Sequence, residues 1–179
     1  ALLLAPGLSS ISPLISGGGQ ERGRRGGTLP TPLIAGFAAA ALDSGGFVSG
    51  APTSGPTASL SSWRDRAERA AIAQGAIVCG AGAPRLPNTT CLALPGVRAD
   101  AQVIALDLAG IAVSAGAACS SGKVATSHVL EAMGMGALAS RAIRVSLPWN
   151  TTEADIDAFI EAYARMADRL RSALVPNAA

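Results

Sequence analysis

The sequence from Leu106 to Gly122 reads LDLAGIAVSAGAACSSG, and it surrounds Cys119 with small side chains. Alanine, glycine and serine bury little surface, so a loop of this composition is expected to order weakly. Its thiol would then be accessible and able to move between two sites. By itself, this stretch indicates a mixed globular domain that carries one cysteine of chemical interest.

The composition of the 179-residue chain is that of a globular protein, with 49% hydrophobic residues. The long apolar stretches, such as residues 31–42, are too short to cross a bilayer, so no membrane partner is expected. The net charge is +2, and Arg22, Arg24 and Arg25 form its one dense cluster, within a glycine-rich loop. Because no basic helix face is present, nucleic acid is not the expected partner.

Three cysteines, Cys79, Cys91 and Cys119, are separated by 12 and 28 residues. These separations match no CxxC metal pattern, so no resident metal is expected. Free thiols in a reducing, cytoplasmic setting are the simplest interpretation. Any one of them could simply be a small buried apolar residue.

Hydrophobic periodicity predicts alternating helices and strands, and therefore an α/β or α+β class. Thr151, Thr152 and Glu153 open the clearest helix, in which Ile156 begins an apolar stripe that we expect to pack on a small sheet. The other predicted elements are strand material over 1–15, helices over 33–42 and 63–74, strands over 89–94, 103–108 and 142–147, and a helix over 129–133 capped by Ser127.

Three motifs together resemble the cysteine desulfurases that serve iron–sulfur cluster assembly, a family of pyridoxal phosphate enzymes of fold type I. The first is the Cys119 stretch, followed by SHVL at 127–130. The second is GGGQERGRRGGT at 17–28, and the third is AIRVSL at 142–147 ahead of TTEADID at 151–157. They follow the family's order across most of the chain, whereas any one alone would be a weak signal.

The resemblance implies that the chain is the C-terminal portion of such an enzyme, usually a homodimer. Residues 1–42 would be the end of the large cofactor-binding domain, with an interior strand at its start. Residues 43–62, rich in Gly, Ser, Pro and Thr where the family usually has a long helix, would be a linker or surface loop. Residues 63–179 would be the small C-terminal α+β domain with the nucleophile loop.

The resemblance also implies roles for three residues. Cys119 would attack the sulfur of L-cysteine, leaving a persulfide on the enzyme and releasing L-alanine. Arg144 would hold the substrate carboxylate, and Thr28 would reach the cofactor phosphate of the partner subunit. The persulfide sulfur would pass to an acceptor or scaffold protein, with at most a transient iron–sulfur contact at Cys119.

The family also uses a catalytic histidine and a lysine that anchors the cofactor. Neither role fits the only histidine, His128, or the only lysine, Lys123. His128 follows Ser127 at a predicted helix start, where capping or packing is expected, and the family's catalytic histidine lies upstream of this chain. Lys123 lies four residues beyond the nucleophile, whereas the family's cofactor lysine precedes residues 1–4. The isolated chain is therefore expected to be inactive.

Two other hypotheses stay open. The chain could be a non-enzymatic fragment or split half that pairs with another chain or carries sulfur on Cys119. It could also belong to a related pyridoxal phosphate lyase or epimerase, although such an enzyme would not need the complete ACSSG loop at 118–122.

Overall fold

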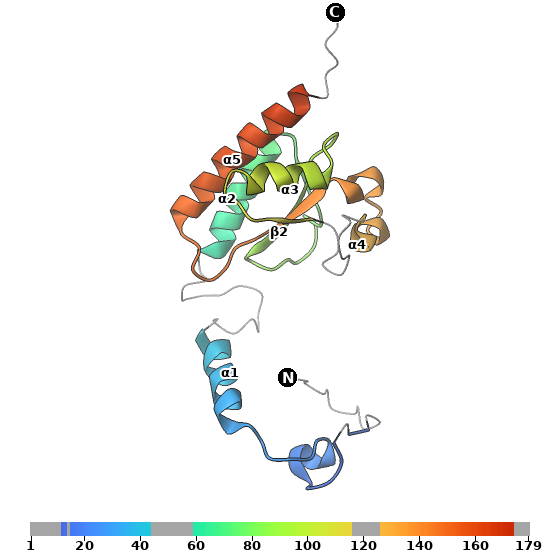
Figure 1. Ribbon diagram of the computed structural model, residues 1–179, viewed down its shortest axis with the longest axis vertical. Helices are drawn as coiled ribbons and strands as arrows, with labels where there is room; N and C mark the ends of the chain where they lie inside the picture. The colour runs from blue at the N-terminus through green and yellow to red at the C-terminus, as the bar shows by residue number, and fades with distance from the viewer. Residues whose placement is uncertain (1–11, 14, 44–58, 116–125, 174–179) are drawn as a thin grey trace, which may run out of the picture. The chain divides into compact units, whose positions relative to one another are not determined.

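The computed structural model describes residues 12, 13, 15–43, 59–115 and 126–173. The chain divides into two compact units, Ala1–Asp43 and Ser44–Ala179. Figure 1 shows the helices and strands of each. No helix within the described ranges is long and apolar enough to cross a membrane.

The first unit consists of a glycine-rich turn and one helix. A short 3-10 segment, η1 (Gln20–Gly23), precedes α1 (Thr31–Asp43), which confirms the predicted helix and begins two residues earlier. Pro32 lies in its first turn, where a missing N–H costs nothing. Of the strand predicted over 1–15, only residues 12, 13 and 15 are described, and none of them is in a strand.

The second unit is built on a four-stranded antiparallel sheet of order β1-β2-β4-β3. The two central strands are β2 (Thr89–Ala93) and β4 (Ala142–Ser146), and both confirm predicted strands to within one residue. The edges are short, with β1 (Ile77–Val78) beside β2 and β3 (Ser114–Ala115) beside β4. The chain is therefore an α/β protein whose sheet is small and antiparallel.

The strand predicted over 103–108 is wrong, because residues 103–107 belong to helix α3 (Ala99–Asp107) and Leu108 is its C-cap. The apolar run fits either period when it is read alone. In the fold, Ala99, Gln102 and Leu106 are buried at helical spacing, while Ile104 between them is 61% exposed. Gln102 donates from Nε2 to the backbone oxygens of Val97 and Arg141, at 3.1 and 2.7 Å, which ties α3 to the start of β4.

The main core lies on one face of the sheet, beneath α2 (Leu60–Ala73), α3 and α5 (Glu153–Ser172) (Figure 1). Alternate residues of β4 point into it, as the two-residue period of a strand requires. The predicted apolar stripe of α5 is confirmed and packs against this core. The large buried side chains of the core are Leu60, Leu92, Leu94, Leu106, Ile143, Val145, Leu147, Ile156, Phe159, Tyr163 and Met166.

Helix α2 begins at Leu60, three residues before the predicted start, so residues 60–62 are not linker. Leu60 is only 2% exposed and belongs to the main core, which explains why the helix extends this far. Asp43, the first residue of the predicted linker, ends α1. Residues 44–58 of that segment lie outside the described residues.

The start of α5 is fixed by a capping box. The Thr152 hydroxyl accepts from the Asp155 backbone N–H at 3.3 Å, and the Asp155 carboxylate accepts from the Thr152 N–H at 2.8 Å. These bonds satisfy helix N–H groups that have no partner within the helix.

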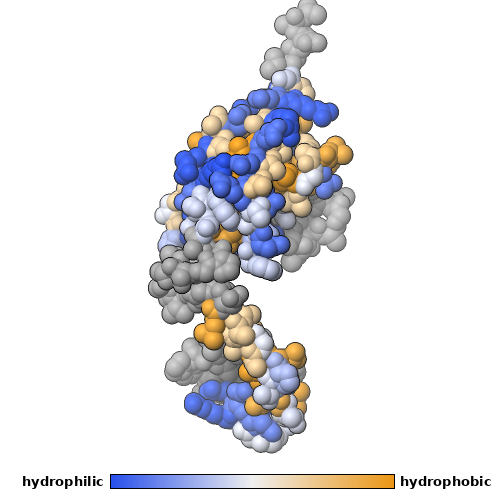
Figure 2. All heavy atoms as spheres, turned by 90° about the vertical axis from the view of Figure 1, so that its left-hand side faces the viewer, coloured by the Kyte–Doolittle hydropathy of each residue, from blue (hydrophilic) through white to orange (hydrophobic). Residues whose placement is uncertain are grey.

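Figure 2 shows the hydrophilic outer surface of the second unit on the side where α2 and α5 lie.

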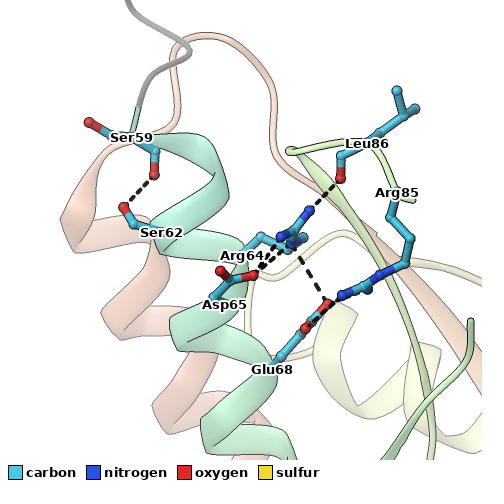
Figure 3. Close-up of polar contacts among 7 residues, drawn as sticks. All are labelled: Ser59, Ser62, Arg64, Asp65, Glu68, Arg85 and Leu86. Carbon is cyan, nitrogen blue, oxygen red and sulfur yellow. Dashed lines mark hydrogen bonds and ion pairs between the residues drawn. The ribbon is translucent and has the colours of Figure 1, made fainter. Parts of the chain in front are cut away.

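A network of charged side chains closes the space between α2 and the segment before β2 (Figure 3). Arg85 donates to both carboxylate oxygens of Glu68, at 2.6 and 3.1 Å, and Arg64 donates to the backbone oxygen of Leu86 at 2.7 Å. Burial disfavours the charged form of Glu68. The hydrogen bonds and charge of Arg85, with the charge of Arg64, outweigh burial and lower the pKa of this carboxyl.

Removing the cap of α5 should destabilise the second unit. We expect Thr152→Ala to lower the free energy of unfolding by about 1 kcal/mol, because the first-turn N–H group loses its acceptor. Urea denaturation of the two proteins measures the difference. Thr152→Ser, which keeps the hydroxyl acceptor, is the matched control, and an equal loss in both variants would contradict the assignment.

The Glu68 contacts should make stability depend on acid pH. A carboxyl with a lowered folded-state pKa contributes stability above 4.5, its ordinary value, and loses it as the pH falls through the folded-state value. We expect Glu68→Gln to cost about 1–3 kcal/mol at pH 7 and progressively less below pH 4.5.

Urea denaturation at a series of pH values measures this dependence. Glu131→Gln, at an exposed glutamate of the short helix α4 (His128–Ala132), is the control and should show no such change. A cost for Glu68→Gln that stays constant from pH 7 to pH 3 would contradict the account.

Candidate functional site

The second face of the sheet is only partly covered. Helix α4 and the 3-10 segment η2 (Gly136–Ser140) pack over one end of it, around a small core of Cys79, Ala93, Leu130, Ala139 and Ala142. Farther along the same face, Arg144 is exposed. The alternation of β4 therefore places a hydrophobic core on one side and a charged, accessible side chain on the other.

Arg144 lies in the centre of the sheet, opposite Cys91 on β2 and opposite Ser114 on β3. Its Nη2 donates to the Ser114 hydroxyl at 3.3 Å. Among the described residues, Arg144 forms no ion pair, whereas Arg64, Arg66 and Arg85 each have a carboxylate partner. A guanidinium held by a rigid strand, with donors left free, is suited to binding a carboxylate through two oxygens.

The loop that carries Cys119 joins two fixed points of the domain. It leaves β3 after Ala115, and it returns at Ser127, whose hydroxyl accepts from the Leu130 N–H at 3.4 Å and caps α4 as predicted. Residues 116–125 themselves, including Cys119 and Lys123, lie outside the described residues. The roles predicted for this cysteine and lysine stay predictions.

Thr28, the predicted phosphate ligand, follows a loop folded tightly on itself. The Gly26 N–H donates to the Ile15 oxygen at 2.7 Å, and a side chain at Gly26 would meet the Gly17 oxygen at 2.9 Å. Gly27 has a φ of +86°, a backbone conformation that favours glycine. Thr28 is exposed, its hydroxyl has no partner among the described residues, and its predicted role stays a prediction.

His128 occupies the first position of α4 and is exposed. The neighbouring Ser127, rather than His128, supplies the cap. The expectation that His128 is not a catalytic base stays a prediction.

The sequence interpretation missed two neighbours of the site. Ser114, which holds Arg144, was treated only as part of the small-residue loop. Cys79 and Cys91 were treated as separate thiols, although Ile77 pairs with Ala93 and Val78 with Leu92, which brings the two cysteines opposite each other. Both facts follow from strand pairing. The sequence interpretation placed a strand at 103–108, whereas the edge strand beside β4 is β3, at Ser114 and Ala115.

Comparison with protein families agrees with this geometry. The family model for aminotransferase class V matches residues 14–159, which include the Thr28 loop, the Cys119 loop and Arg144. The chain belongs to the class-V aminotransferase family.

Its relatives within this family include proteins named cysteine desulfurase. One from Cereibacter sphaeroides is 42% identical over 96% of the chain, and one from Sinorhizobium fredii is 40% identical over 88% of it. The chain spans 43% and 40% of the lengths of these two proteins. It therefore corresponds to about two fifths of such class-V proteins.

Solved structures of the family show the same fold. A NifS-like protein from Rickettsia africae superposes with a TM-score of 0.65 at 32% identity, covering 88% of this chain and 40% of that one. A second NifS-like protein gives a TM-score of 0.63 at 30% identity over 89% of this chain.

Proposed function

We propose that the class-V protein to which this chain belongs is a cysteine desulfurase, which takes sulfur from L-cysteine onto Cys119 and releases L-alanine. The observation that carries the proposal is the pairing of β3 with β4. It sets Arg144, a candidate carboxylate ligand, beside the strand from which the Cys119 loop leaves. Cys119 follows Ala115 by four residues, a span that reaches at most about 14 Å.

The two units support the proposed division of labour. The first unit, with Thr28, would belong to the end of the large cofactor-binding domain, and the second would be the small domain with the nucleophile loop. Leu33, Phe37 and Leu42 of α1 are 73%, 66% and 81% exposed in this chain. Apolar side chains this exposed are expected to pack against other parts of the protein. A homodimer of chains as long as those of the relatives would provide that contact.

The residues present fit pyridoxal phosphate at one point, its phosphate. The free hydroxyl of Thr28 and the backbone of the glycine-rich loop before it suit a phosphate oxygen of the cofactor held by a partner subunit. Pyridoxal phosphate, when bound, supplies an electron sink that the protein's own side chains lack. Its anchoring lysine would lie in the part of the protein that precedes this chain.

This chain's residues would act on the substrate in two ways. Arg144 would bind the carboxylate of L-cysteine and so orient its side chain. The Cys119 thiolate would then attack the substrate sulfur, so that the new S–S bond forms as the C–S bond breaks and the carbon takes a proton. A cytoplasmic setting would keep this thiol reduced, and the persulfide sulfur would pass to an acceptor protein.

Replacing the nucleophile should abolish sulfur transfer. We expect Cys119→Ser in the full-length protein to lower alanine production from L-cysteine by at least about a thousandfold, because serine cannot accept the sulfur. Alanine release measures the loss, and an unchanged visible absorbance of bound pyridoxal phosphate would show that the variant is folded and loaded. Undiminished alanine production would favour a lyase, and a preparation that never binds the cofactor would favour a non-catalytic half.

Replacing Arg144 should weaken binding of the substrate carboxylate. We expect Arg144→Lys to raise KM for L-cysteine at least about tenfold, the effect of losing one charge-assisted hydrogen bond of about 1.5–3 kcal/mol. Arg69→Lys, at an exposed arginine of α2 on the opposite side of the sheet, is the control. Equal KM values in the two variants would contradict the role of Arg144.

A further inference from the structure

Two thiols outside the proposed nucleophile loop are direct neighbours. Cys79 lies just past β1 and Cys91 in the middle of β2, and the register of these strands places them opposite each other. The Cys79 N–H donates to the Cys91 oxygen at 2.8 Å, which continues the ladder by one residue. Opposed residues of an antiparallel pair project to the same face, so both side chains point away from the main core.

The register of Cys79 and Cys91 meets the Cα criterion for a disulfide. The Cα atoms of a hydrogen-bonded antiparallel pair are about 5.5 Å apart. Disulfides in proteins join Cα atoms roughly 4.4–6.8 Å apart. Both cysteines are free thiols in this structure. The Cα separation expected for this register therefore lies within the range that a disulfide spans.

The pair is reachable by a small molecule. Both cysteines line a cavity of about 220 Å³, together with Arg85, Leu86, Thr89 and Thr90. Cys79 is 5% exposed and Cys91 is half-buried. This cavity is open to solvent and large enough to admit a molecule such as hydrogen peroxide.

The two thiols are electrostatically unequal. The Cys91 S–H donates to the Cys79 sulfur, which lowers the pKa of Cys79 although burial opposes the shift. The same hydrogen bond, with burial, raises the pKa of Cys91. These shifts favour the thiolate at Cys79, and Cys91 lies beside it, where it can resolve the product of oxidation.

We propose that Cys79 and Cys91 form an oxidisable dithiol, a modification site that hydrogen peroxide converts reversibly to a disulfide. The Cys79 sulfur attacks one peroxide oxygen, so an S–O bond forms, the O–O bond breaks, and hydroxide leaves and takes a proton as water. The Cys91 sulfur then attacks the resulting sulfenic acid, so the S–S bond forms, the S–O bond breaks and a second water leaves. The two thiols lose two electrons, which reduce one peroxide to two waters.

The disulfide would act on the part of the sheet that carries Arg144. It would fasten the two-residue edge strand β1 to β2, at the residue that lies opposite Arg144 on β4. This inference does not rest on the proposed desulfurase activity, since it uses neither Cys119 nor the cofactor.

Peptide mapping of the full-length wild-type protein tests the proposal. Trypsin separates the three cysteines of this chain, because cleavage after arginine and lysine leaves Cys79 in residues 70–85, Cys91 in 86–98 and Cys119 in 99–123. After hydrogen peroxide treatment, alkylation of the remaining thiols and denaturation, we expect peptides 70–85 and 86–98 to be recovered linked. Their mass should be about 2 Da below the sum of the two, and dithiothreitol should separate them.

The controls separate this pair from the loop cysteine. Cys119→Ser should leave the yield of the linked peptides unchanged, and Cys91→Ser should abolish it while Cys79 is still oxidised. Recovery of 70–85 and 86–98 as separately alkylated peptides, under peroxide that oxidises Cys119, would overturn the proposal. So would a link from either peptide to residues 99–123.

Discussion

The antiparallel pairing of β2 with β4 is the constraint on which the rest of the second unit depends. Five residue pairs, from Thr89 with Ser146 to Ala93 with Ala142, join segments that are about fifty positions apart in the sequence. The side-chain alternation of this pair sends Leu92 and Ile143 into the main core and leaves Cys91 and Arg144 on the other face. One ladder therefore builds the hydrophobic core and the accessible face together.

This division explains why the site can be partly open while the domain stays folded. The helices α2, α3 and α5 cover the core face, and the charged contacts of Glu68 with Arg85 close its edge. On the opposite face, the described residues that cover the sheet are those of α4 and η2 at one end, and Arg144 is exposed beyond them. A rigid strand holds the arginine, while the thiol predicted to react lies on a separate connecting loop, as positioning and transfer require.

The sequence predicted what local patterns determine. The capping residues of α5 and its apolar stripe, the strands at β2 and β4 and the Ser127 cap all follow from short-range signals. Residues 103–108 were misassigned because this mostly apolar segment fits two periods, and only the burial of Gln102 and Leu106 against the sheet selects the helix. Leu60 was assigned to a linker because its composition is that of a loop, whereas its burial is a tertiary effect.

The candidate site shows the same limit. The family motifs pointed to Arg144 and Thr28, and both are exposed with free donors, but the pairing of Cys79 with Cys91 and the support of Arg144 by Ser114 depend on register. Register joins distant segments, so no spacing rule within one segment reveals it. The role of Cys119 rests on motif resemblance and on where its loop is attached.

The most direct test of the central claim is the mass of the tryptic peptide 99–123 after the full-length protein has met L-cysteine once, without a reductant. Our account predicts that this peptide gains about 32 Da, the mass of one sulfur atom, in step with the release of one alanine, and that dithiothreitol removes the added mass. Alanine release with an unmodified 99–123 peptide, or sulfur found only on another cysteine, would contradict it.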